Sequence, residues 1–151
     1  MENIRLREGT PEDIPQLLSL IRELALYEKA PEEVINTEEQ MIQDGFGEVR
    51  LFQLLVAETE EKLVGLALTY YRYSTWKGKC LYLEDLYIQP EYRRSGLGER
   101  FFEALVQRAK KENCQRISWQ VLDWNELAIN FYKKIGASLD ATWINGTLEV
   151  Q

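Results

Sequence analysis

A strand, a glycine-rich turn and an amphipathic helix follow one another directly, and this succession constrains the fold most strongly. Residues 80–89 are almost entirely apolar, which is typical of a strand that is covered on both faces. After Pro90 comes Arg93-Arg94-Ser95-Gly96-Leu97-Gly98, and then a helix to about Glu112 whose apolar side chains share one stripe. We therefore expect a sheet with helices on its faces.

The remaining segments supply further strands and helices. Strands are expected over residues 4–8, 51–58, 63–73 and 116–122, with a hairpin at 138–150 that turns at Asn145-Gly146. Helices are expected from Pro11 to near Glu28, from Thr37 to near Gly47, and from Glu126 to Ile135. No repeat or linker divides the sequence. We therefore expect one domain over residues 1–151, of the α/β (α+β) class.

Composition excludes several kinds of chemistry. The 151 residues include no histidine, which excludes the Ser-His-Asp triad, the Cys-His pair, histidine-ligated zinc and an imidazole base. Acid–base chemistry must then come from carboxylates, Tyr, Lys, Cys, the backbone or water. We expect no metal in the site.

Charge and cysteine content limit the partners and the compartment. The net charge of −7 disfavours nucleic acid as the main partner and is compatible with a cationic ligand. Cys80 and Cys114 form no C-x-x-C pair and do not make a disulfide scaffold. Residues 1–5 have no apolar leader core, and no apolar run is long enough to cross a membrane. We expect a cytoplasmic protein with no membrane partner.

The turn Arg93-Arg94-Ser95-Gly96-Leu97-Gly98 is the sharpest local signal for ligand binding. Glycines allow the backbone to approach a ligand, and the N–H groups at the start of the following helix point toward it. The helix dipole and the two arginines favour negative charge, so a phosphate group suits this turn. The alternative is an ordinary helix start with solvated arginines, because neither a Walker A nor a Rossmann fingerprint is present.

Glu84 and Asp85 are adjacent carboxylates within an otherwise apolar strand. A buried charge without a partner is costly, so each needs a partner or a role. Neighbours on a regular strand point to opposite faces, so only one of the two can address a given cleft unless a bulge intervenes. The alternative is a structural ion pair with an arginine. For Glu84, which precedes the anion-binding turn, we favour function.

Asn125 and Tyr132 indicate a function only in combination with that turn. Asn125 follows a strand and is most simply a helix cap. Tyr132 shares a helix face with Ile129 and Gly136, which is typical of a core aromatic residue. Taken alone, neither residue indicates a function.

Together these segments resemble the GNAT family of acetyl-CoA-dependent N-acetyltransferases, whose diphosphate-binding turn is Arg/Gln-x-x-Gly-x-Gly/Ala. Within that family the chain resembles the spermidine/spermine N-acetyltransferase group. The matching stretches run through nearly the whole chain in order: residues 21–28, 44–48, 82–85, 92–93 and 130–133. The resemblance implies the GNAT fold, a central mixed, mostly antiparallel twisted sheet flanked by helices.

One departure from that group bears on the substrate. Polyamine acetyltransferases of the group carry Asp-Pro before the tryptophan that is Trp76 here, whereas this chain has Ser74-Thr75. Residues 73–78 and 121–125 resemble instead the thialysine N-acetyltransferase branch. The missing carboxylate favours a shorter amine or an amino-acid side chain over a long polyamine.

The resemblance also implies residue roles. Tyr132 would be the general acid, and, because the chain has no histidine, Glu84 acting through water is the candidate base. On the amine side the resemblance implies Tyr27, Glu28, Ser74, Trp76 and Glu84. For the coenzyme it implies Leu86, Tyr87, Ile88, Arg93, Arg94, Ser95, Gly96, Leu97, Gly98, Glu99, Asn125, Glu126, Leu127 and Ala128.

These roles predict an enzyme that moves an acetyl group from its co-substrate acetyl-CoA to the primary amine of a small cationic substrate, such as a thialysine-like amino acid or a diamine. The amine would attack directly in a ternary complex. Two alternatives remain open: a protein or peptide amine acetyltransferase, and a non-catalytic acyl-CoA-binding regulatory module. The resemblance also implies a homodimer.

Overall fold

The computed structural model describes residues 3–151. The described chain divides into two compact units, one that extends to Gln120 and one from Val121 to Gln151. The first unit holds a five-stranded sheet, whose strands are β1 (Arg5–Glu8), β2 (Gln53–Glu58), β3 (Leu63–Ser74), β4 (Gly78–Ile88) and β5 (Ile117–Ser118). Its α-helices are α1 (Ile14–Tyr27), α2 (Glu38–Phe46) and α3 (Leu97–Lys111).

The sheet is mixed and mostly antiparallel. Its strand order is β1-β2-β3-β4-β5, and every neighbouring pair is antiparallel except β4 and β5, which are parallel. The register of β3 with β4 runs from Ser74 opposite Gly78, beside their connecting turn, to Gly65 opposite Ile88. The predicted class, a mixed sheet flanked by helices, is confirmed.

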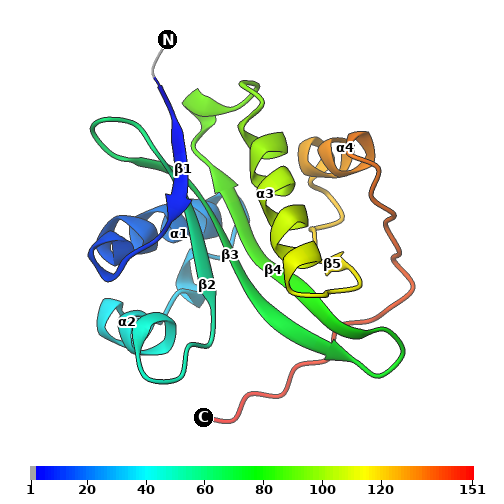
Figure 1. Cartoon of the computed structure of the whole chain (residues 1–151). Helices are drawn as coiled ribbons and strands as arrows, with labels where there is room; N and C mark the ends of the chain where they lie inside the picture. Colours follow the sequence, from blue (N-terminus) through cyan, green and yellow to red (C-terminus); the bar gives the residue numbers. More distant parts are fainter. Residues whose placement is uncertain (1–2) are drawn as a thin grey trace. The chain divides into compact units, whose positions relative to one another are not determined.

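Helices cover both faces of the sheet. Strand β3 shows this, because its successive residues point to opposite faces. Leu66 and Leu68 pack in one core with Leu18 of α1. Gly65 instead lies against α3, where an added Cβ would come within 3.3 Å of the Phe101 ring. Figure 1 shows α1 and α2 on one side of the sheet and α3 along the other. Residues 63–69 of β3 are therefore buried between two helical layers.

The predicted helix starts are largely confirmed. Thr37 caps α2, because its Oγ1 accepts a hydrogen bond from the Gln40 N–H at 3.1 Å. The start of the first helix differs in detail: Pro11–Asp13 form a short 3-10 turn, and the α-helix begins at Ile14. Short 3-10 turns are common at the ends of α-helices.

An ion-pair cluster joins the start of α1 to the edge of the sheet. The Arg7 guanidinium of β1 pairs with Asp13 at 2.8 Å and with Glu58 of β2 at 2.9 Å. Hydrogen bonds from Arg7, and then from Arg5, lower the pKa of Glu58 to about 2. Hydrogen bonding to Arg7 also lowers the pKa of Asp13. These carboxylates therefore remain ionised in the folded protein well below neutral pH.

The second unit contains helix α4 (Glu126–Lys134). As predicted, Asn125 caps this helix: its Oδ1 accepts a hydrogen bond from the Ala128 N–H at 3.3 Å. Gly136 follows the helix with a left-handed backbone, φ 92°, which glycine adopts without a steric cost.

Two sequence predictions for the C-terminal part are wrong. The hairpin predicted at 138–150 is not formed, because residues 138–151 contain no strand. An isolated two-stranded hairpin is only marginally stable, and Trp143 and Ile144 are exposed rather than packed in a core. The strand predicted at 116–122 is reduced to β5. The described pairs of β5 are with Leu81 and Tyr82 of β4, and the bulge at Glu84 follows two residues after the second pair.

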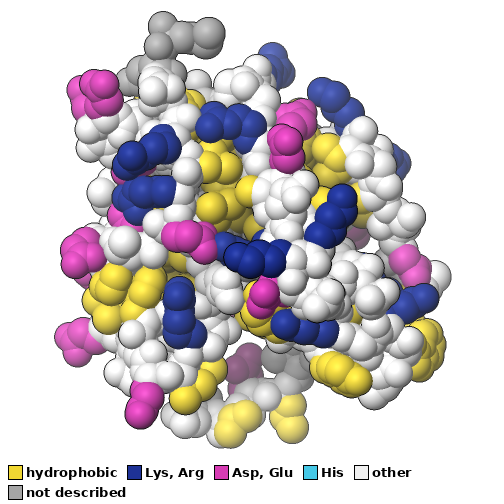
Figure 2. All heavy atoms as spheres, in the orientation of Figure 1, with side chains coloured by type: hydrophobic (Ala, Val, Ile, Leu, Met, Phe, Trp, Pro, Cys, Tyr) yellow, Lys and Arg dark blue, Asp and Glu magenta, His cyan; other side chains and the backbone are white. Residues whose placement is uncertain are grey.

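Charged side chains of both signs lie on the surface. On the face shown in Figure 2, Lys and Arg side chains are interspersed with Asp and Glu. Within residues 3–151, no helix has both the length and the apolar character needed to cross a membrane.

Candidate active site

A β-bulge in β4 brings two adjacent carboxylates to one face of the sheet. Asp85 pairs with Leu68 and Leu83 pairs with Thr69, so Glu84 is the extra residue on β4. A bulge interrupts the alternation of side chains, so neighbours that would point apart can share a face. The sequence allowed both carboxylates to face one cleft only if a bulge intervened. The bulge is present, and Glu84 and Asp85 line the same pocket.

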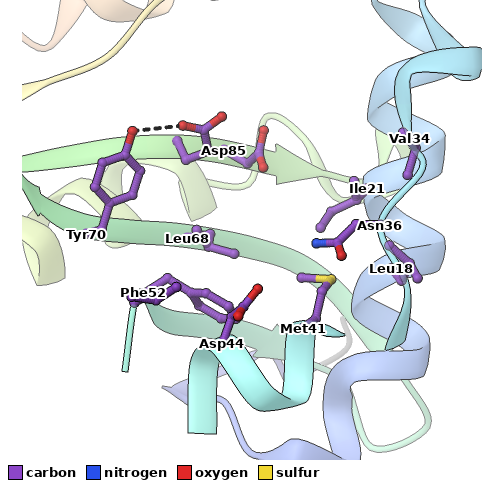
Figure 3. Close-up of a pocket in the computed structure, with 12 residues that line it drawn as sticks. Leu18, Ile21, Val34, Asn36, Met41, Asp44, Phe52, Leu68, Tyr70 and Asp85 are labelled. Carbon is purple, nitrogen blue, oxygen red and sulfur yellow. Dashed lines mark hydrogen bonds between the residues drawn. The ribbon is translucent and has the colours of Figure 1, made fainter. Parts of the chain in front are cut away.

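That pocket has a volume of about 450 Å³. Its apolar lining consists of Leu18, Ile21, Val34, Met41, Leu51, Phe52 and Leu68. Its polar lining consists of Asn36, Asp44, Tyr70, Glu84 and Asp85. Figure 3 shows Tyr70 and Asp85 on the strands, Met41 on α2 and Asn36 on the segment before α2. Among the described lining residues every charged group is acidic, so the pocket suits a cation attached to an apolar chain.

The two carboxylates have different surroundings. Glu84 is exposed, and its Oε1 accepts a hydrogen bond from the Tyr70 hydroxyl at 3.2 Å. Asp85 is half-buried, and its carboxylate has no hydrogen bond or ion pair with any other described residue. Within residues 3–151, neither carboxylate pairs with an arginine. The structural ion pair that was the alternative interpretation is therefore not formed.

Burial and neighbouring charges shift several pKa values here. Burial, followed by the charges of Glu84 and Glu28, raises the pKa of Asp85 to about 7. Burial also raises the pKa of Glu28. Burial and the Glu84 carboxylate raise the pKa of Tyr70 to about 12, so its hydroxyl remains a hydrogen-bond donor at neutral pH. A pKa near 7 for Asp85 is typical of groups in acid–base catalysis.

The other residues predicted for the amine side lie in two places outside the lining of this pocket. Tyr27 and Glu28 are at the C-terminal end of α1. Ser74 and Trp76 are in the β3–β4 turn, where the Ser74 hydroxyl accepts hydrogen bonds from the N–H groups of Trp76 and Lys77. Trp76 is 83% exposed. Of the predicted amine-side residues, Glu84 is therefore the one that lines the pocket.

Sequence reasoning missed several residues of the pocket. Asn36, Asp44 and Tyr70 line it but were not predicted, although Asp44 begins one of the stretches that resemble the family. Asp85 was noticed only as the neighbour of Glu84. Asp85 shares a face of the sheet with Glu84 only because of the bulge, and a bulge is a property of the pairing between two strands.

The turn before α3 has an unusual backbone. Arg94 and Gly96 both have left-handed backbones, with φ of 63° and 81°. Gly96 starts α3 without a side-chain cap, and a Cβ added to it would meet no atom within 4 Å. The first N–H groups of a helix have no partner within the helix. The turn is therefore open to a phosphate group.

Arg93 is held by protein groups. Its Nε–H donates to the Ile88 carbonyl oxygen at 2.8 Å. Its guanidinium carbon lies 5.7 Å from the centre of the Tyr27 ring and 5.6 Å from that of the Tyr87 ring. The Tyr87 hydroxyl in turn donates to Glu23 of α1 at 3.0 Å. Arg93 therefore connects the end of α1, the end of β4 and the turn.

The edge of β4 beside β5 is only partly paired. In the described structure, β5 pairs with Leu81 and Tyr82, whereas the predicted coenzyme residues 86–88 lie farther along β4. Backbone groups at such an edge can hydrogen-bond an extended ligand.

The remaining predicted residues belong to the unit 121–151. Asn125 caps α4, and Glu126 to Ala128 begin it. Tyr132 lies on the same helix, with its ring centre 5.7 Å from that of Phe131. These positions make Asn125 a cap, as predicted, and leave the catalytic role of Tyr132 as a prediction.

Comparison with known proteins identifies the family of this chain. The model of the acetyltransferase (GNAT) family matches residues 15–137. Thialysine N-epsilon-acetyltransferase of Bos taurus is 41% identical over 145 aligned positions, covering 91% of this chain and 85% of that protein. Spermidine/spermine N(1)-acetyltransferase-like protein 1 of Homo sapiens is 35% identical, covering 91% of this chain and 21% of that protein. The crystal structure of a possible acetyltransferase from Clostridium difficile 630 has a TM-score of 0.82 at 20% identity, covering 99% of this chain and 100% of that chain.

The fold and the matching sequences are those of an acetyltransferase. More particularly, the chain belongs to the GNAT family. The predicted resemblance, the GNAT fold and the prediction of an enzyme are confirmed.

Proposed function

We propose that this enzyme transfers the acetyl group of acetyl-CoA to the primary amine of a small cationic substrate, a thialysine-like amino acid or a diamine, by direct attack in a ternary complex. The observation that carries the proposal is the pocket beside the β4 bulge, whose charged lining residues, within the described chain, are all acidic. An ammonium group on a short apolar chain would match both parts of that lining. The relatives named thialysine N-epsilon-acetyltransferase support the same substrate class.

The residues of the first unit fit acetyl-CoA. The turn from Arg94 to Glu99 would hold the diphosphate through N–H groups at the uncapped start of α3. The backbone of residues 86–88 would bind the pantetheine and acetyl parts, and its N–H groups would hydrogen-bond the acetyl oxygen. By resemblance, Asn125 to Ala128 would also contact the coenzyme. When bound, acetyl-CoA supplies a thioester whose carbonyl carbon is the electrophile.

The amine must lose a proton before it can attack. A primary amine with a pKa of about 10.4 is only about 0.04% free base at pH 7, so reaching the free base costs about 4.6 kcal/mol. Acidic side chains attract the ammonium but oppose its deprotonation. Because the chain has no histidine, the carboxylates at the bulge are the candidate proton acceptors. The sequence predicts Glu84 for this task, acting directly or through water, and Asp85 is a second carboxylate in the lining of the same pocket.

Tyr132 would donate a proton to the departing sulfur. The support for this role is the match of residues 130–133 to the family's pattern. An ordinary phenol has a pKa of about 10 and a thiol about 8.5, so the transfer is uphill by about 2 kcal/mol. That cost is small enough for a transfer concerted with departure of the sulfur.

Thiol release from acetyl-CoA tests the proposal. The purified chain would be assayed with thialysine, lysine, short diamines, spermidine, small amines of the glyphosate type and a lysine-containing peptide. We expect release that depends on the amine and is fastest with thialysine or a short diamine. Release with the peptide alone would favour the protein acetyltransferase alternative, and no release with any amine would refute the proposal.

We also propose that the working form is a homodimer in which each chain is one acetyltransferase domain, residues 1–151. Four large apolar side chains near the C-terminus, Trp143, Ile144, Leu148 and Val150, are exposed. Exposed apolar groups of this kind favour a protein partner, and a second copy would cover them. Light scattering should give the mass of a dimer. The mass of a monomer at micromolar concentration would contradict this.

A further inference from the structure

Glu84 and Asp85 are suited to different tasks, although they line one pocket. The Tyr70 hydroxyl, 3.2 Å from Oε1, fixes the position of the exposed Glu84 carboxylate. The half-buried Asp85 carboxylate has no such contact with another described residue. A fixed, solvated carboxylate is suited to binding a cation, whereas a less solvated one without partners is suited to taking up a proton.

Two neighbouring carboxylates disfavour the negative charge of Asp85. Glu84 precedes it on β4, and Glu28 at the end of α1 acts on it through its charge. Asp44 of α2 and Tyr70 of β3 line the same pocket. No Lys or Arg is among the described residues of that lining. Burial and the neighbouring carboxylates raise the pKa of Asp85 to about 7, whereas Tyr70, with a pKa of about 12, stays neutral through this range.

We propose that Asp85 accepts the proton of the bound ammonium, and that Glu84, held by Tyr70, binds that ammonium. This inference rests on the proposed acetylation of an amine. One proton moves from the substrate nitrogen to an Oδ of Asp85, and the freed lone pair of the nitrogen forms the bond to the acetyl carbon as the carbon–sulfur bond breaks. The second proton leaves the nitrogen as the amide forms and balances the proton that the sulfur takes up. Asp85 then releases its proton to solvent.

The magnitude of the shift favours Asp85 for this task. With the ordinary value of 3.8, proton transfer from an ammonium of pKa about 10.4 would be unfavourable by about six and a half pKa units. A pKa of about 7 improves that transfer equilibrium by about 10³-fold. A base also works best when its pKa lies near the working pH, because it is then both ionised and strongly basic.

The pH dependence of kcat/KM for the amine, with saturating acetyl-CoA, tests the division of tasks. In the wild-type enzyme kcat/KM should rise with an apparent pKa near 7. Asp85→Asn should abolish this rise and lower kcat by about 10² to 10⁴-fold. Glu84→Gln should raise KM for the amine and keep the rise, but move it to lower pH, because Asp85 loses a neighbouring negative charge. Asp44→Asn, the matched control, removes a carboxylate from the same pocket and should also keep the rise.

If kcat/KM of Asp85→Asn still rises with pH near 7, the proposal is overturned. It is also overturned if Glu84→Gln abolishes that rise. Asn has nearly the shape of Asp, and equal melting temperatures would show that the variant folds. A second measurement needs no turnover: carbon NMR of labelled Asp carboxyl groups, in which Asp85→Asn identifies the Asp85 signal. Titration of that signal near pH 7 supports the proposal, and titration near pH 4 overturns it even when amine acetylation is intact. If the enzyme acetylates no amine, the proposed function fails independently of this titration.

Discussion

The two arginines of the turn before α3 should contribute to coenzyme binding in different ways. Arg93 donates a hydrogen bond to the Ile88 carbonyl at 2.8 Å and lies over the Tyr27 and Tyr87 rings. Arg94 is exposed and forms no hydrogen bond or ion pair with another described residue. Arg93→Ala would therefore remove structural contacts, whereas Arg94→Ala would remove a solvated positive charge.

The contacts of Arg93 set the expected size of the effect. A hydrogen bond from a charged donor contributes about 1.5 to 3 kcal/mol, and each cation–π contact contributes about 0.5 to 1 kcal/mol at an exposed site. Because water can partly replace the guanidinium at Ile88, we expect Arg93→Ala to lower the free energy of unfolding by about 2 to 4 kcal/mol. For a chain of this length that loss lowers Tm by about 5 to 15 °C. Arg94→Ala should change stability by less than about 0.5 kcal/mol.

Calorimetry at two salt concentrations separates the roles. Arg93→Ala should melt earlier and bind acetyl-CoA more weakly at both concentrations, because the turn loses its support. Arg94→Ala should keep the wild-type Tm and bind more weakly only at low salt, because salt screens an exposed charge. An unchanged Tm for Arg93→Ala, with a loss of affinity that high salt removes, would show that its guanidinium acts directly on the ligand and would refute this reasoning.

Three further predictions concern the catalytic acid, the acid stability and the glycine of the turn. Tyr132→Phe should lower kcat far more than it raises KM for acetyl-CoA, because it removes a proton donor; an unchanged kcat in steady-state assays takes Tyr132 out of the mechanism. Arg7→Met should move the midpoint of acid unfolding, followed by circular dichroism, to higher pH. Arg7 is the main cause that lowers the pKa of Glu58 from the ordinary 4.5 to about 2. The ionised Glu58 therefore stabilises the fold fully above pH 4.5, and this contribution is lost as the pH falls toward 2. Identical midpoints for Arg7→Met and the wild type would contradict the prediction. Gly96→Ala and Gly136→Ala should each cost about 1 kcal/mol of stability, because φ of 81° and 92° strains a residue with a Cβ. Only Gly96→Ala should weaken binding of acetyl-CoA by calorimetry, and equal weakening by both would remove the turn from the site.

Local chemistry made much of the fold predictable. Thr37 and Asn125 cap their helices as expected, because a cap requires only a side-chain oxygen two or three residues before a free N–H. The apolar residues Leu81 and Leu83 of the strand before the turn are buried as the sequence predicts, whereas Glu84 in the same strand is exposed. The turn itself has left-handed residues where the glycine pattern predicts a close approach to a ligand. In each case the cause lies within a few residues of the effect.

By itself, then, the sequence determined the family and the class of fold, and it predicted the turn as a site for an anion. Tertiary structure alone decided that Glu84 and Asp85 share a pocket, because a bulge exists only in the pairing of β4 with β3. It also decided that Arg93 lies over two tyrosine rings from separate elements, and that residues 138–150, although patterned like a hairpin, form no strand. The physical reason is the same throughout: pKa values, side-chain contacts and strand pairing depend on groups that are distant in sequence, and only folding brings those groups together.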